Sequence, residues 1–108
     1  MHLTLSPQRA EQKLHLQRQG DVLTINGTEY DFTQLPEGAT LSRAAVDCDW
    51  LASDVERVGG MLHLTLVLPH GGSASPETLF PIPIINPPDG PVILPPYTDA
   101  REASENGD

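Results

Sequence analysis

Aromatic residues, cysteine and long apolar runs are all scarce in this chain of 108 residues. Aromatic side chains make up 5% and hydrophobic residues 38%, which is low for a packed globular chain. No window approaches the roughly 18 consecutive apolar residues of a membrane-spanning helix. The first residues lack the basic start and apolar centre of a signal peptide. The length is that of one domain, with no membrane partner expected.

Basic residues are also few, because six Lys and Arg stand against fifteen Asp and Glu, for a net charge of −9. Direct binding to nucleic acid needs a concentrated positive face and is not expected. The single cysteine, Cys48, excludes an internal disulfide and a multi-cysteine zinc site. Asp47 and Asp49 flank it and disfavour the thiolate, so Cys48 is predicted to be a small buried apolar group. The expected setting is a reducing cytoplasm, or a particle that leaves the cell.

Charge and proline are unevenly distributed. Residues 21–58 hold eight acids and two arginines, whereas residues 59–96 hold two acids and no Lys or Arg. Nine of the eleven prolines lie between Pro69 and Pro96, so no helix is expected there. Residues 97–108 are small, polar and acidic, which predicts a disordered tail that is dispensable for folding. The sequence therefore predicts a single β domain over residues 1–96.

Asn26–Gly27 lies between two β-prone runs and is the strongest local hairpin signal in the chain. A two-residue turn of type I′ at this place pairs Ile25 with Thr28 and Leu23 with Tyr30. One face of the hairpin then collects apolar side chains and the other collects polar ones, as a half-buried antiparallel pair requires.

Gly59–Gly60 predicts a second hairpin, in which Val58 pairs with Met61. The long run after this turn is rich in leucine and is expected to be a central strand. Its leucines share one face with Val55, and His63 shares the other face with Glu56. The leucines are Leu62, Leu64, Leu66 and Leu68.

Weaker signals complete the sheet. Alternating leucines predict two strands before the first hairpin, near residues 3–5 and 14–16, which together with that hairpin suggest a meander. Ser42 is predicted to cap a short helical turn over residues 43–46. A last short strand is predicted over residues 91–94.

The proline-rich stretch predicts an edge strand over residues 79–84. Pro81 and Pro83 remove two N–H groups from the same side, which protects that edge from further pairing. The alternative is a polyproline segment that docks into an aromatic groove of a partner. The apolar side chains of the stretch are expected to be buried, and three of them are expected to share one face: Phe80, Ile82 and Ile84.

The fold class that follows is all-β, an antiparallel sandwich or open barrel built from hairpins, with one short helical turn at most. A homodimer or higher oligomer is expected. It would form through an unprotected strand edge, at residues 1–6 or 13–17, or through the leucine-rich face.

No residue pattern predicts catalysis. His63 and Glu56 form a cross-strand pair, and two ligands do not make a closed zinc site, so neither metal nor cofactor is expected. The serines lack a nucleophile elbow, and the glycine-rich loop after His70 lacks the lysine of a phosphate loop. Trp50 is predicted to anchor the core or a hairpin flank, with a contact platform as the alternative. The candidate interaction residues are Trp50, Pro81, Pro83 and Tyr97.

Four segments of the chain resemble small uncharacterised proteins encoded in proteobacterial prophages, often near tail genes. The segments are residues 20–41, Val55–Val58, Leu62–His70 and Gly90–Pro96. The resemblance covers most of residues 1–96 and implies a bacterial cytoplasm or a virion as the setting. It implies no activity and no functional residue.

Two functional hypotheses remain. The first is a non-enzymatic structural or protein-interaction module, associated with a phage tail and other phage proteins. The second is an acidic decoy that occupies a nucleic-acid-binding protein. They differ in the placement of the carboxylates, because a decoy needs them along one face and a module would scatter them.

Overall fold

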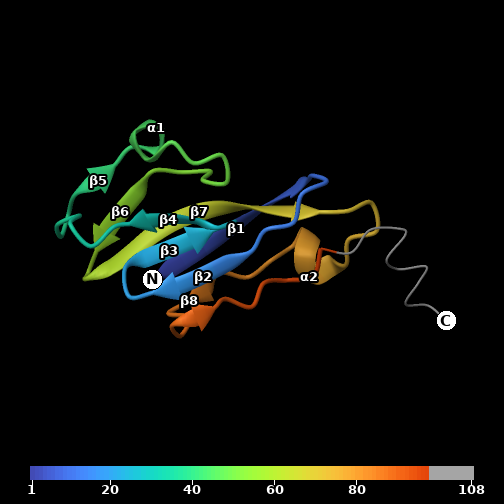
Figure 1. Ribbon diagram of the computed structural model, residues 1–108. Coiled ribbons are helices and arrows are strands. Elements are labelled where there is room, and N and C mark those ends of the chain that lie inside the picture. The colour runs from blue at the N-terminus through green and yellow to red at the C-terminus, as the bar shows by residue number, and fades with distance from the viewer. Residues whose placement is uncertain (98–108) are drawn as a thin grey trace.

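The computed structural model describes residues 1–97, which fold into two β-sheets (Figure 1). The first sheet has the order β5-β6-β7-β1-β8, and the second has the order β4-β3-β2-β9. The predicted all-β class is confirmed. The strands of the first sheet are β5 (Thr40–Leu41), β6 (Val55–Val58), β7 (Met61–His70), β1 (His2–Arg9) and β8 (Ile84–Ile85). Those of the second are β4 (Thr28–Asp31), β3 (Val22–Ile25), β2 (Leu16–Gln19) and β9 (Gly90–Pro91).

Both predicted hairpins form in the predicted register. In β3–β4, Leu23 pairs with Tyr30, and the turn residues Asn26 and Gly27 have φ of 49° and 86°. Positive φ at both central positions is what a type I′ turn requires, and it matches the right-handed twist of the strands. In β6–β7, Val58 pairs with Met61 as predicted.

The predicted meander is wrong, because the N-terminal strand joins the other sheet. β1 pairs with β7 in parallel over eight residues, from His2 opposite His63 to Arg9 opposite His70. Its other neighbour is β8, whereas β2 lies between β3 and β9. The segments that were expected to offer an unprotected edge are therefore partly covered: His2 and Leu3 lie between β7 and β8, and Gln17 lies between β3 and β9.

The core lies between the two sheets and consists mostly of leucine. Leu3 of β1, Leu66 of β7 and Leu23 of β3 are each fully buried, so both sheets contribute. The four leucines of β7 are all buried, as their alternation predicted. Cys48 is buried among them and is a free thiol, as expected.

Arg57 links the two sheets by hydrogen bonds. It lies on β6, and its guanidinium donates to the carbonyl oxygens of Leu35 and Phe32 at 2.6 and 3.1 Å. It also donates to Asp21 Oδ2 at 2.9 Å. The planar five-donor group suits such a site, where several acceptors converge from one side.

Two short helices complete the described chain. α1 (Arg43–Val46) begins where predicted, and the Ser42 hydroxyl accepts from the N–H of Ala45 at 3.2 Å. α2 (Pro76–Leu79) contradicts the expectation that the proline-rich stretch holds no helix. Pro76 occupies the first turn, where its missing N–H has no intrahelical acceptor to serve. In the part of the chain that the structure describes, no helix is long and apolar enough to cross a membrane.

The predicted edge strand over residues 79–84 is also wrong. Its only paired residues are in β8, and residues 80–83 have no strand partner. The last predicted strand is shorter than expected, since β9 is followed by one further bond, from the N–H of Val92 to the Leu16 carbonyl at 2.9 Å. The stretch therefore runs along one border of the sandwich rather than across its face (Figure 1).

Candidate functional site

Beside Leu79, which is 38% exposed, four large apolar side chains of the proline-rich stretch have more than half of their surface exposed to solvent. We call them the apolar strip: Phe80, Ile82, Ile85 and Ile93, with 80%, 82%, 60% and 91% of their surface exposed. The first three flank or belong to β8, and the fourth follows β9, so both sheet borders contribute. Gathered exposed apolar side chains on a monomer mark contact sites, and this chain has four such side chains within residues 80–93. The strip is therefore the candidate functional site.

The exposure of the strip corrects the expectation that this stretch is buried. Alternating side chains share a buried face only when the backbone is held flat in a ladder. Pro81 and Pro83 cannot donate to a ladder, and residues 80–83 pair with nothing. Phe80 and Ile82 are consequently free to face solvent, whereas Ile84, inside β8, is half-buried against the core.

The turn between β8 and β9 is fixed to the rest of the molecule. Arg18 of β2 donates to the carbonyl of Pro87, and the N–H of Gly20 donates to Asp89 Oδ1 at 2.9 Å. At the other sheet, the Met1 ammonium donates to Asn86 Oδ1 at 2.6 Å. Burial lowers the pKa of that ammonium, and the nearby Arg18 charge lowers it further. The backbone between Ile85 and Ile93 of the strip is thus anchored to both sheets.

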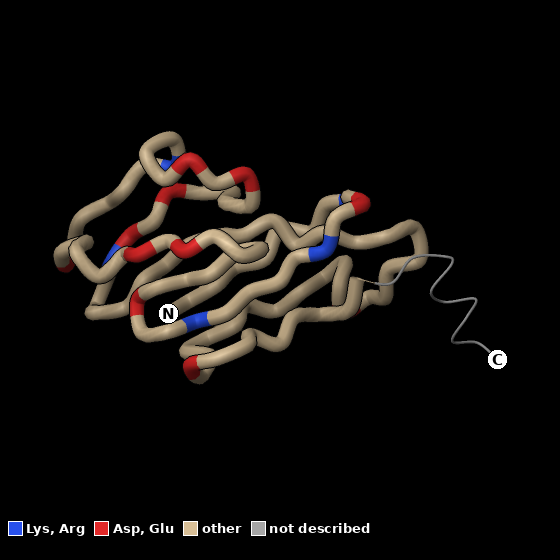
Figure 2. The backbone as a smooth tube through the Cα atoms, viewed as in Figure 1, with Lys and Arg blue, Asp and Glu red and all other residues tan. Residues whose placement is uncertain are grey.

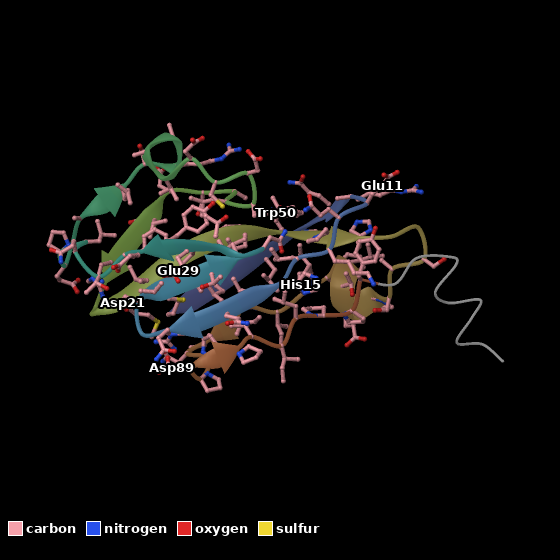
Figure 3. All side chains as sticks on the ribbon, in the orientation of Figure 1. Glu11, His15, Asp21, Glu29, Trp50 and Asp89 are labelled. Carbon is pink, nitrogen blue, oxygen red and sulfur yellow. The ribbon has the colours of Figure 1, made fainter. Side chains whose placement is uncertain are left out.

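The predicted interaction residues do not converge. Pro81 and Pro83 lie in the chain on either side of Ile82 of the strip, and Pro83 is exposed. Trp50 is half-buried against the core, and its carbonyl accepts from the N–H of Val67 at 2.8 Å. Figure 3 shows it on the α1 side of the sheets, away from β8. The structure therefore favours Trp50 as a core anchor, the first of the two interpretations.

Tyr97, assigned above to the tail, packs on the domain. Its hydroxyl donates to the Ala10 carbonyl, its own carbonyl accepts from the N–H of Gly71 at 3.0 Å, and Lys13 Nζ lies 5.3 Å from its ring centre. Residues 98–108, the rest of the predicted tail, lie outside the described residues.

Tyr97→Phe is expected to lower the free energy of unfolding by about 1 kcal/mol, the usual contribution of one hydrogen bond. Tyr97→Ala is expected to cost more, because it also removes the ring beneath Lys13. Urea denaturation of both variants measures the difference. Wild-type stability in Tyr97→Ala would show that this residue is as dispensable as the sequence predicted.

A cleft of about 400 Å³ lies between the sheets beside Tyr97. Both sheets contribute apolar residues to its lining, among them Leu16 of β2 and Leu68 of β7. Among the described residues that line it, Lys13, His15 and Tyr97 carry the polar side-chain groups, and the Tyr97 hydroxyl is engaged with Ala10. The cleft thus brings no carboxylate or thiol together with a base.

The predicted pairing of His63 with Glu56 is confirmed by the register of β6 and β7. The sequence did not predict that His2, opposite His63 on the parallel β1, stacks on it with 5.0 Å between ring centres. Stacked rings direct their nitrogen lone pairs outward in their own planes rather than toward a shared ion. Within residues 1–97, no group of three or more His, Cys, Asp or Glu side chains is arranged to hold a metal.

Tyr30 is the titratable side chain with the largest resolved shift. A hydrogen bond with the Cys48 side chain, burial, and the negative charges nearby raise the pKa of Tyr30 to about 12. Asp47 and Asp49 contribute to that charge. The pair joins β4 to the segment after α1, and it keeps the phenol neutral at any physiological pH.

This shift predicts a loss of stability at alkaline pH. The unfolded phenol has a pKa of about 10. Between that value and the folded value of about 12 the folded state binds more protons, so the free energy of unfolding falls as pH rises. In Tyr97→Phe, Tyr30 is the remaining tyrosine, and its phenolate absorbance should have a midpoint near 12. A midpoint near 10, the unfolded value, would contradict the Cys48 contact.

The carboxylates gather in one half of the molecule. Figure 2 shows most of them around β3–β6 and α1, and few along the border formed by β8 and β9. This follows from the eight acids of residues 21–58, which supply those elements. Hydrogen bonds from the hydroxyl and N–H of Thr33 lower the pKa of Asp31, so this carboxylate on β4 stays ionised. The molecule therefore has an acidic half and a border at β8 and β9 that carries few charges.

Comparison with known proteins gives no match: no known family, curated protein or solved structure resembles the chain significantly.

Proposed function

We propose that this protein is a non-enzymatic protein-interaction module that binds its partner through the apolar strip. The observation that carries the proposal is the exposure of Phe80, Ile82, Ile85 and Ile93 in the stretch that runs along one border of the sandwich (Figure 1). Large apolar side chains held in water are unfavourable by about 25 cal/mol per Å², and covering them drives association. In the phage setting that the sequence resemblance implies, the partners would be other phage proteins, such as tail proteins.

The test is differential capture by an immobilised chain. We expect wild-type protein and Val58→Ser to retain the same bacterial or phage proteins, and Ile82→Ser/Ile93→Ser to lose them. Val58 is a matched control, because it is 53% exposed but lies at the β6–β7 hairpin, remote from the strip. If the strip variant retains every protein that wild type retains, the strip is not the binding surface and the proposal fails.

A second candidate function, the acidic decoy, is favoured by the gathering of carboxylates in one half (Figure 2). A decoy imitates the phosphate array of nucleic acid, so its binding should weaken steeply with salt. The probe is a lysine-rich peptide of about ten residues, a length that spans several phosphate spacings. Glu29→Gln/Asp49→Asn should weaken its binding, and Glu77→Gln, outside the acidic half, should not. Absence of binding at low salt would reject the decoy.

A further inference from the structure

We propose that the outer edge of β4 binds an extended, lysine- or arginine-rich segment of a partner protein as an added strand of the second sheet. This inference does not depend on the apolar strip, because β4 and β8 belong to different sheets. In a contact of this kind the backbone of the partner forms hydrogen bonds with the border strand, and the side chains determine which sequence is accepted.

β4 is the border strand best suited to receive a further strand. The sheet orders β5-β6-β7-β1-β8 and β4-β3-β2-β9 give each sheet two border strands. β5, β8 and β9 are two residues long, and so short an edge gives an added strand little to pair with. β4 has four residues, none of them proline, and it is one arm of the regular β3–β4 hairpin.

The backbone groups of Glu29 and Asp31 face away from the sheet. The N–H of Phe32, directly after β4, donates to the carbonyl of Asp21 at 3.0 Å, so the backbone of Phe32 faces β3. Strand residues direct their backbone groups alternately to the two sides, and those of Glu29 and Asp31 therefore face outward. Within residues 1–97 these outward groups form no hydrogen bond, and both residues are exposed. Each offers one N–H and one C=O group to an added strand.

Carboxylates lie on both sides of this edge and favour a basic partner. Glu29 and Asp31 alternate with the half-buried Tyr30, so their side chains lie on the solvent-facing side of the sheet. The hydrogen bond to the buried thiol raises the pKa of Tyr30 most, and the charges of Asp49 and Asp47 add to it, so these two carboxylates lie close to the side that Tyr30 occupies. An added strand also alternates its side chains, and basic residues at successive positions therefore meet carboxylates on either side.

The same carboxylates disfavour a second copy of this chain at the edge. Two β4 strands side by side would bring Glu29 and Asp31 of one copy against those of the other, and like charges opposite each other in a sheet are unfavourable. Charged side chains on border strands commonly prevent self-pairing in this way. The contact also differs from that of an acidic decoy, which needs charge alone, because it requires backbone pairing.

Two peptides of about ten residues and equal charge test the added strand. The first is rich in lysine, with valine and threonine at the remaining positions to favour an extended backbone. The second has the same sequence with every interior amide N-methylated. In calorimetric titrations at low salt, wild type and Glu77→Gln should bind the first peptide about tenfold or more tightly than the second, which cannot donate to the edge. Glu29→Gln/Asp31→Asn keeps the N–H groups but loses both charges, so it should bind the first peptide more weakly than wild type does.

Amide hydrogen exchange locates the contact. The N–H groups of Glu29 and Asp31 should exchange fast in the free chain and slowly when the first peptide is bound. Tyr30, whose N–H faces β3, is the internal control and should be protected in both states.

Four results would overturn the proposal. Absence of binding, or binding that leaves exchange at Glu29 and Asp31 unchanged, rejects the edge of β4 as the site. Equal binding of both peptides rejects the added strand and leaves an acidic surface that acts by charge alone. Slower exchange at these two residues on raising the protein concentration without peptide means that a second copy occupies the edge, and rejects the basic partner. None of these results alters the capture test of the apolar strip, so the two proposals fail separately.

Discussion

Leu3→Ala is expected to lower the free energy of unfolding by about 2–5 kcal/mol, a large part of the 5–15 kcal/mol that stabilises a typical domain. Leu3 is fully buried in the internal strand β1, opposite Leu64 on one side and Ile84 on the other. Removing its side chain leaves a cavity between two strands whose backbones are fixed by hydrogen bonds, so little collapse can compensate for the loss.

Chemical denaturation of Leu3→Ala beside Thr4→Ala measures this effect. Thr4 is the next residue of the same strand and is exposed, so its replacement should change stability by less than about 0.5 kcal/mol. Equal losses in the two variants would mean that β1 does not present Leu3 to the core, and the parallel pairing with β7 would be in error.

Arg57→Met is expected to cost about 2–4 kcal/mol. The change leaves the Leu35 carbonyl without its guanidinium donor, and an unsatisfied partly buried acceptor costs about 1–3 kcal/mol. The Phe32 carbonyl loses one of two donors and keeps the N–H of Leu35 at 3.1 Å. The ion pair with Asp21 should contribute less, because the Asp21 side chain is 33% exposed and that of Arg57 only 14%.

Two further variants separate these contributions. Asp21→Asn keeps both carbonyl contacts and should lose less than half of what Arg57→Met loses. Arg57→Lys keeps the charge but cannot reach three acceptors with a planar group, so it should resemble Arg57→Met. If Asp21→Asn proves the more damaging change, the charge pair rather than the carbonyl contacts links the sheets.

Local signals predicted local structure well. The turns at Asn26–Gly27 and Gly59–Gly60 determine the register of their strands within a few residues, and both registers are as predicted. The parallel partner of β1 is about sixty residues distant, and no turn connects the two. The alternation of Leu3 and Leu5 indicates a strand but not which strand it pairs with. The prediction therefore placed it next to its neighbours in sequence, as a meander, and this was wrong.

The candidate site was predicted in part. The proline pattern identified the stretch that contains Pro81 and Pro83, but not that Phe80 and Ile82 would be exposed there. The prediction assumed a continuous strand, whose alternation would have buried both side chains. The proline spacing itself could have predicted this exposure. Prolines have no N–H group to donate, so they weaken the hydrogen-bond ladder that a continuous strand needs.

The parallel pairing of β1 with β7 also affects when the protein can fold during synthesis. The ribosome adds about 5–20 residues per second. β1 therefore leaves it seconds before either of its neighbours, β7 and β8, exists. The β3–β4 hairpin can close in microseconds during that interval, but Leu3 and Leu5 have no sheet to join. Folding of both sheets is completed only when β8 and β9 emerge, so the N-terminal strand is the first to be made and among the last to be covered.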